Sequence, residues 1–203
     1  MERKPLTIQG YYQKQDSQPF QYYRSVSANG KEIVVEVDFL AGEYGGTARS
    51  HRHQKAQDVQ PRKARGCDLA FERPMVIRIN GRLPDGTEDS VMVRVASIAP
   101  FLMMKGIALA RRDKAKDAWD IYFCLMNYPQ GLDALAEEFR PHMNHGLFRE
   151  GLEALATKFR SATDFGPTRI ADFEGLTDAD DRAILQQDAY QRTKYLLERL
   201  GLS

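Results

Sequence analysis

The chain has 203 residues, a formal net charge of +1, 42% hydrophobic residues and 28% charged residues. This length can bury a core as one domain or as two closely packed ones, and the balanced charge excludes a global electrostatic field directed at nucleic acid. The polar N-terminus does not resemble a secretion signal, and no apolar run approaches membrane-spanning length. We therefore expect a cytoplasmic protein with no membrane partner.

Strands come first along the chain. Residues 21–27 and 32–40 flank Asn29-Gly30, a pair typical of the two-residue turn of a β-hairpin. Side chains alternate between the two faces of a strand, so Glu36 and Asp38 share one face. Further short apolar runs predict strands at residues 68–71, 75–79 and 91–95.

From residue 98 onward the apolar spacing is helical. The expected helices cover residues 98–112, 117–127, 132–139 and 146–161, and a last one begins near Thr177 and Asp180 and ends at Gly201. The sequence therefore predicts an α+β protein. A mixed or antiparallel sheet over residues 1–97 precedes a C-terminal helical bundle over residues 98–203.

Lys105 lies on the first expected helix, and Asp117 and Asp120 lie three residues apart on one face of the second. In a structural interpretation Asp117 caps the second helix, Asp120 complements its dipole, and Lys116 pairs with Asp120. In a functional interpretation the lysine beside two carboxylates binds phosphate. The residues alone leave both interpretations open.

Two segments resemble a known family. Residues 105–109 read Lys-Gly-Ile-Ala-Leu, Arg111 or Arg112 follows, and residues 116–122 read Lys-Asp-Ala-Trp-Asp-Ile-Tyr. This order resembles the K-x-x-A-L-x-x-R-x-x-x-K-D-x-x-D-I/L-Y stretch of AbiEii/AbiGii-type nucleotidyltransferases, the toxin halves of abortive-infection toxin–antitoxin systems. Residues 33–40 resemble the strand that bears the family's third metal-binding carboxylate. The resemblance extends over about residues 32–128.

The resemblance implies a polymerase-β-like nucleotidyltransferase core, of which residues 1–97 form a partial, β-rich copy. It implies Mg²⁺-dependent transfer of a nucleotide from a nucleoside triphosphate to RNA, such as tRNA, or to protein, and a cognate antitoxin as partner. It assigns Asp38 as a metal ligand and Lys105 as a phosphate contact, with Asp117 and Asp120 orienting the lysine or taking part in transfer. The expected substrate-binding residues are basic: Arg62, Arg65, Arg112 and Lys116.

The sequence also departs from the family pattern. The family places a Gly-Gly/Ser turn and an Asp-x-Asp strand before the position of Asp38, and residues 1–31 contain no Asp-x-Asp. The pair Gly45-Gly46 comes after Asp38, in the wrong order, and Gln60 stands where a second carboxylate after Asp58 is needed. We therefore expect a truncated or degenerate transferase with little activity.

Two other classes of function stay open from the sequence. One is a non-catalytic module that binds an antitoxin, RNA or nucleotide on a degenerate nucleotidyltransferase scaffold. The other, less favoured, is a metal nuclease that uses Glu36 and Asp38.

A basic segment covers residues 49–65, with six Lys or Arg and a single acidic residue. This segment could steer a triphosphate or an RNA end, or it could be a solvated connection. Within it, His51 and His53 are expected to be surface residues, because a basic segment repels a cation.

Overall fold

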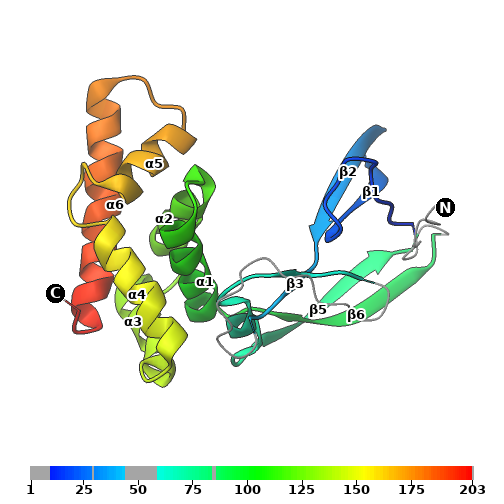
Figure 1. The fold of residues 1–203 in the computed structure, drawn as a ribbon, viewed down its shortest axis with the longest axis horizontal. Coiled ribbons are helices and arrows are strands. Elements are labelled where there is room, and N and C mark those ends of the chain that lie inside the picture. Colours follow the sequence, from blue (N-terminus) through cyan, green and yellow to red (C-terminus); the bar gives the residue numbers. More distant parts are fainter. Residues whose placement is uncertain (1–9, 29, 44–58, 84–85, 203) are drawn as a thin grey trace. The chain divides into compact units, whose positions relative to one another are not determined.

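A computed structural model describes residues 10–28, 30–43, 59–83 and 86–202, and it is an α+β structure. Figure 1 shows its helices and strands in chain order. The chain divides into two compact units, Met1–Asp68 and Leu69–Ser203. The sequence-based division at residues 97/98 grouped all strands together, whereas the contacts place one hairpin in the same unit as the helices.

The first unit contains the predicted hairpin. Strand β1 (Gln21–Ala28) pairs antiparallel with β2 (Lys31–Asp38), and the register pairs Ala28 with Lys31. That register leaves a two-residue connection, and Gly30 adopts the positive φ of 74° that such a turn requires. Two-residue strands β3 (Leu40–Ala41) and β4 (Arg62–Lys63) pair in parallel.

Aromatic side chains form the small core of the first unit. Phe20 and Tyr22 are buried, and the Tyr22 ring meets the Phe39 ring edge-on at a centroid distance of 5.2 Å. Other apolar side chains on the same hairpin stay exposed, including Ile33 at 48% and Val35 at 39%. The packing therefore covers only one end of the hairpin.

The prediction of a strand at residues 68–71 is wrong. Residues Cys67–Phe71 form a 3-10 helix that follows Gly66, whose φ is 82°. A four-residue apolar run does not distinguish a strand from a helical turn, and here the turn points Leu69 into the core at 0% exposure.

The strands expected at residues 75–79 and 91–95 are both present, each is longer than expected, and together they form a hairpin. Strand β5 (Met75–Arg82) pairs antiparallel with β6 (Glu88–Val95). Most of its side chains are exposed on both faces.

Six α-helices follow in the described part of the second unit. Their bounds are α1 (Ile98–Arg111), α2 (Ala115–Asn127), α3 (Gly131–Phe139), α4 (Gly146–Lys158), α5 (Phe165–Phe173) and α6 (Ala179–Arg199). Five of them agree with the predicted helices within three residues at either end. The sequence analysis predicted no helix at α5, whose first turn contains Gly166 and Pro167.

The main core lies among these helices, and α1 crosses α4 closely within it. A Cβ atom built on Gly106 would lie 2.7 Å from the carbonyl oxygen of Gly151, so two glycines bring the backbones together. Leu102, Met103 and Ile107 of α1 are at most 1% exposed beside this crossing. α1 is therefore fixed closely against α4.

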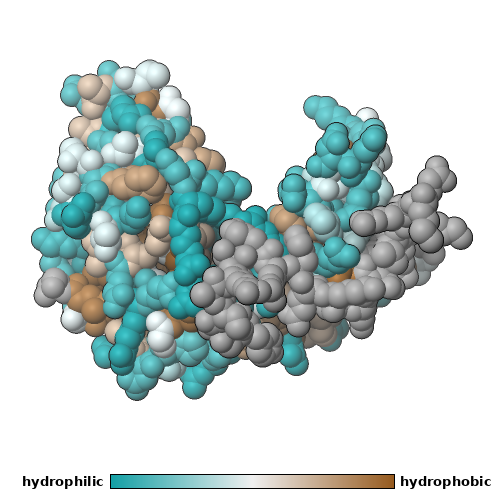
Figure 2. All heavy atoms as spheres, viewed as in Figure 1, coloured by the Kyte–Doolittle hydropathy of each residue, from teal (hydrophilic) through white to brown (hydrophobic). Residues whose placement is uncertain are grey.

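The outer surface of the helices is mixed in character. Figure 2 shows mostly hydrophilic residues over the visible face of the helical part, with hydrophobic residues between them. None of the helices in the described residues combines the length and apolar character needed to cross a bilayer.

Candidate functional site

The predicted site residues of the second unit meet where α1 and α2 pack together. We call Lys105, Arg112, Lys116, Asp117 and Asp120 the Lys105 cluster. Helix α2 begins at Ala115, two residues earlier than expected, with Lys114 at the N-cap position. Asp117 therefore lies inside the first turn, and its predicted role as the helix cap is wrong.

Lys105 bridges the two carboxylates of α2. Its Nζ lies 3.1 Å from Oδ1 of Asp117 and 2.6 Å from Oδ2 of Asp120. The i,i+3 spacing places both carboxylates on the helix face that α1 covers. The predicted proximity of the lysine to both aspartates is confirmed.

Two further cations complete the Lys105 cluster. Arg112 donates to Asp117 through Nε at 2.7 Å and Nη2 at 3.0 Å, a bidentate arrangement. Lys116 donates to Oδ1 of Asp120 at 2.6 Å, as its i,i+4 spacing predicted. Arg112 reaches back to α2 because it leaves α1 with an extended backbone, φ −146° and ψ 150°.

The ion pairs of the Lys105 cluster are partly buried. The side chain of Asp117 is 1% exposed and that of Lys105 is 21% exposed. Burial alone would raise the pKa of Asp117, but hydrogen bonds from Arg112 and Lys105 outweigh it and hold the pKa below its usual value. Burial would likewise lower the pKa of Lys105, and hydrogen bonds to Asp120 and Asp117 raise it instead. Lys105 and Asp117 are therefore both charged at neutral pH.

The exposed side of the Lys105 cluster is cationic. Three cations face two carboxylates, so one positive charge is left over. The side chains of Arg112 and Lys116 are each 51% exposed, whereas both carboxylates are at most 10% exposed. An anion arriving from solvent meets the cations, whose positions the buried carboxylates fix.

Helix α2 is held in place by polar contacts from its other faces. The hydroxyl of Tyr122 donates to Asp188 of α6 at 2.8 Å, and burial together with this bond raises the pKa of Tyr122 to about 12. The indole N–H of Trp119 donates to Glu174, and its ring packs on Phe173 at 5.1 Å. These contacts hold α2 against α6 and the end of α5.

Asp38 does not occupy the expected position. It ends β2, one of two strands in its sheet, opposite Gln21, and its side chain is exposed. The family resemblance led us to expect Asp38 on a central strand, and that expectation is wrong: among the described residues no strand pairs with the free edge of β2, and an isolated bridge from Tyr12 reaches Tyr23 of β1 instead. Asp38 belongs to the first unit and Lys105 to the second.

The described residues do not fit a magnesium ion. Across residues 10–28, 30–43, 59–83 and 86–202 no group of three or more His, Cys, Asp or Glu side chains could hold a metal. Glu36 shares the face of Asp38, but its carboxylate accepts a hydrogen bond from Gln21 at 3.1 Å. Mg²⁺ needs more than one such anchor, so the described residues around Asp38 do not support a metal-dependent step.

The two basic candidates of the first unit have local partners. The guanidinium of Arg62 lies over the Phe20 ring at 5.5 Å, and Arg65 lies 3.9 Å from Glu43. The Gly45-Gly46 pair, His51, His53 and Asp58 lie outside the described residues.

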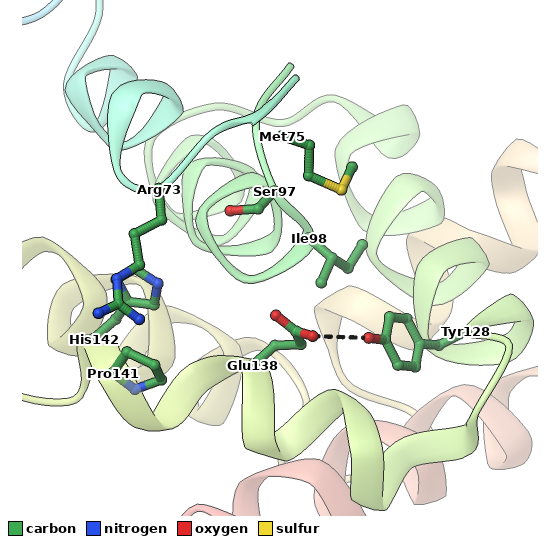
Figure 3. A pocket seen from close by; sticks show the side chains of 8 residues that line it. All are labelled: Arg73, Met75, Ser97, Ile98, Tyr128, Glu138, Pro141 and His142. Carbon is green, nitrogen blue, oxygen red and sulfur yellow. Dashed lines mark hydrogen bonds between the residues drawn. The ribbon is translucent and has the colours of Figure 1, made fainter. Parts of the chain in front are cut away.

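The cavity that the sequence analysis missed lies elsewhere in the second unit. It has a volume of about 310 Å³ and is lined in part by Arg73, Glu138 and His142 (Figure 3). Arg73 has a left-handed backbone, with φ 48°. No sequence pattern signals that conformation at an arginine, so this cavity could not be found from the sequence.

No curated protein and no solved structure matches the sequence. The family model described as "Nucleotidyl transferase AbiEii toxin, Type IV TA system" matches residues 7–198. That match covers both the hairpin with Asp38 and the helices of the Lys105 cluster. The chain therefore belongs to the AbiEii nucleotidyl transferase toxin family of type IV toxin–antitoxin systems.

Proposed function

We propose that the chain binds the phosphates of a nucleoside triphosphate at the Lys105 cluster, as the nucleotide-binding part of a toxin that transfers a nucleotide to RNA or protein. The observation that carries this proposal is the arrangement of three cations on two buried carboxylates, with distances of 2.6–3.1 Å. A cognate antitoxin is the expected protein partner of a toxin from such a system.

Asp117 and Asp120 act as positioning residues in this proposal. Each carboxylate accepts from two cations, so the ammonium of Lys105 and the guanidinium of Arg112 are held in one geometry before a ligand arrives. A preorganised cation loses little side-chain entropy when it binds phosphate. Lys105, Arg112 and Lys116 then contact the triphosphate through charge-assisted hydrogen bonds.

Titration of a labelled nucleoside triphosphate into the wild type and into Lys105→Ala tests the proposal. We expect Lys105→Ala to weaken binding by about 1–3 kcal/mol, the scale of one or two charge-assisted hydrogen bonds. If the lysine is only a structural brace, the substitution lowers stability and the folded fraction binds with unchanged affinity. Equal affinities, or no binding by either protein, would end the phosphate proposal.

The chain offers a matched control for the arginine. Arg111 precedes Arg112, is 49% exposed on its side chain, and lies 3.4 Å from Glu150 of α4 instead of Asp117. We expect Arg112→Ala to weaken triphosphate binding and Arg111→Ala to leave it unchanged. An equal loss in the two variants would mean that nonspecific charge, and not the Lys105 cluster, attracts the nucleotide.

Catalysis by residues 1–203 alone is expected to be weak. Asp38 is the proposed metal ligand, and the described residues supply no metal cluster around it. We expect little or no Mg²⁺-dependent transfer of labelled nucleotide to tRNA or to protein. Robust transfer that Asp38→Ala abolishes would show that other carboxylates of this chain complete the site.

A non-catalytic binding module is the second candidate function. The same lack of a carboxylate cluster in the described residues favours it, because phosphate binding at the Lys105 cluster needs no metal ligand. Triphosphate binding without measurable transfer, in the presence of Mg²⁺ and tRNA, would favour this candidate over the transferase.

A further inference from the structure

The connection between α1 and α2 sets the position of Arg112. Three residues, 112–114, join the two helices. Arg112 and Lys114 both have an extended backbone, with φ of −146° and −128°. Lys114 holds the N-cap position of α2 without a side-chain capping bond. Asp113 lies in the middle of this connection, where a contact of its side chain fixes the path of the chain.

Asp113 forms an ion pair with α5. Its Oδ2 accepts a hydrogen bond from Nη2 of Arg169 at 2.5 Å. Neighbouring side chains of an extended segment point to opposite sides. Arg112 accordingly reaches Asp117 of α2, whereas Asp113 reaches α5, which lies beside α2 (Figure 1). The connection is therefore held from both sides.

Arg169 is itself held by contacts within α5 that extend to α6. Its Nη1 donates to Asp172 at 3.0 Å, and its guanidinium lies over the Phe165 ring at 5.2 Å. The other oxygen of Asp172 accepts from Arg182 of α6 at 2.8 Å. Ion pairs of alternating sign thus run from α6 through α5 to the connection beside the Lys105 cluster.

The geometry of Arg169 has a cost that its own helix does not explain. Its Nε is buried and has no hydrogen-bond partner among the residues that the structure describes. An arginine that only paired with Asp172, three residues on, could do so through Nε. Arg169 instead uses its two terminal nitrogens for two carboxylates on different segments. A buried donor left without a bond costs free energy, so this geometry favours a role in joining the segments over that of an ordinary surface pair.

We propose that Arg169, acting through Asp113, is a positioning residue for Arg112. The inference rests on the phosphate site proposed above. The pair holds the connection so that the guanidinium of Arg112 is bound to Asp117 before a triphosphate arrives. Arg112 then loses less side-chain entropy when it contacts phosphate. Neither Arg169 nor Asp113 touches the ligand.

The order of the Arg112 side chain tests the proposal without any nucleotide. Its Nε–H donates to Asp117 at 2.7 Å, so ¹⁵N relaxation of that group measures how firmly the guanidinium is held. We expect Asp113→Ala to lower the order parameter. The matched control is Asp133→Ala, because Asp133 is 62% exposed, against 56% for Asp113, and also pairs with an arginine of another helix, Arg199. An order parameter that Asp113→Ala leaves unchanged would overturn the proposal.

Calorimetric titration with inorganic triphosphate tests the effect on phosphate binding. Removing a carboxylate beside a cationic site raises the positive charge, so electrostatics alone predicts tighter binding by Asp113→Ala. Lost positioning predicts the opposite, a loss of about threefold to tenfold, the scale of ordering one long side chain. Asp133→Ala removes the same charge and should not weaken binding. Unchanged or tighter binding by Asp113→Ala would contradict the positioning role.

Two further variants show whether the effect passes through Arg112. In the Arg112→Ala background, Asp113→Ala should cause no further loss of affinity, because the residue on which it acts is gone. Arg169→Ala should reproduce Asp113→Ala in the otherwise wild-type chain. The single tryptophan, Trp119, packs on Phe173 of α5, so unchanged tryptophan emission in these variants shows that α5 still packs against α2.

The outcomes separate this proposal from the phosphate site on which it rests. An equal loss of affinity from Asp113→Ala with and without Arg112 would mean that Asp113 acts by another route, and the positioning role would be wrong. A wild type that does not bind inorganic triphosphate would count against the phosphate site itself. In that case the order of the Arg112 side chain still decides whether Arg169 positions it.

Discussion

Asp117 joins cations from two segments of the chain, Lys105 within α1 and Arg112 just beyond its end. It is 1% exposed, so its charge is removed from water and depends on these partners. The residue therefore links the geometry of the proposed phosphate contacts to the stability of the α1–α2 packing.

Asp117→Asn should be strongly destabilising. The amide keeps the size of the side chain but removes the charge that compensates two cations, and breaking a buried pair in this way costs about 3 kcal/mol or more. Urea denaturation followed by circular dichroism measures the change in the free energy of unfolding. The control Glu137→Gln removes an exposed partner of Arg140, and it should leave the free energy of unfolding nearly unchanged.

The Lys105 cluster should also give the stability a pH dependence of known sign. The pKa of Asp117 is lowered in the folded state, so its contribution is present above the unfolded pKa and is lost as the pH falls through the folded pKa. The pKa of Lys105 is raised, so its contribution is lost as the pH rises through the folded pKa, in the alkaline range. Denaturation midpoints from pH 2 to pH 11 should therefore fall at both ends, and Asp117→Asn should flatten the acid side. An unchanged acid slope in the variant would contradict this assignment.

At this scale the sequence predicted the meeting of Lys105 with two aspartates, because i,i+3 spacing fixes which residues share a helix face. It did not predict that Arg112 binds Asp117, since that contact depends on the extended backbone just after α1. The sequence likewise did not predict the left-handed backbone of Arg73, because tertiary contacts and not local propensity maintain such a conformation.

At the scale of helices and strands, the crossing of α1 and α4 sets the position of the Lys105 cluster. Gly106 and Gly151 meet there, and either Cβ would lie 2.7 Å from an atom of the other helix. Gly106 is the neighbour of Lys105, so a shift of α1 at the crossing moves the lysine.

Gly106→Ala should destabilise the protein by about 1–3 kcal/mol, because the added methyl group meets backbone that yields only if α1 moves. Gly146→Ala is the matched control, since its Cβ would have no neighbour within 4 Å at the start of α4. The control should be neutral or stabilising by about 0.5 kcal/mol. Thermal unfolding of the two variants compares them directly, and equal midpoints would contradict the close crossing.

Helices with regular apolar spacing were predicted well at this scale, because α1, α2, α3, α4 and α6 each bury one face. No helix was predicted at α5, where Pro167 in the first turn resembles a breaker in sequence. The 3-10 helix Cys67–Phe71 was mistaken for a strand because its apolar run is too short to show a period. The sequence of one strand does not show whether that strand lies at the edge or in the centre of a sheet. The expectation that Asp38 lies on a central strand was wrong for this reason.

At the scale of the whole molecule, the two hairpins differ from the helices in how much apolar surface they bury. On one face of the β5–β6 hairpin, three residues of β5 lie opposite three valines of β6. The three β5 residues, Met75, Ile77 and Ile79, are 41–52% exposed. An isolated two-stranded hairpin is only marginally stable in water. The helical core therefore supplies most of the stability of its unit.

Substitutions in the two regions should differ accordingly. Ile77→Lys should change the free energy of unfolding of the helices by no more than about 0.5 kcal/mol and should reduce binding of the dye ANS to exposed apolar surface. Leu102→Ala, at 0% exposure on α1, should cost about 2–5 kcal/mol. A large loss of helical stability in Ile77→Lys would show that another surface covers this face of the hairpin.

The exposed apolar faces of the hairpins also affect the heat capacity of the protein. Unfolding raises the heat capacity because apolar side chains enter water, and side chains that already contact water add little to that rise. Most of the increment should therefore come from the helices, and the value per residue for the whole chain should lie below the usual figure of about 12–15 cal/mol/K. A smaller increment makes the stability curve flatter, so the protein would lose less of its stability on cooling than a fully packed domain of the same length.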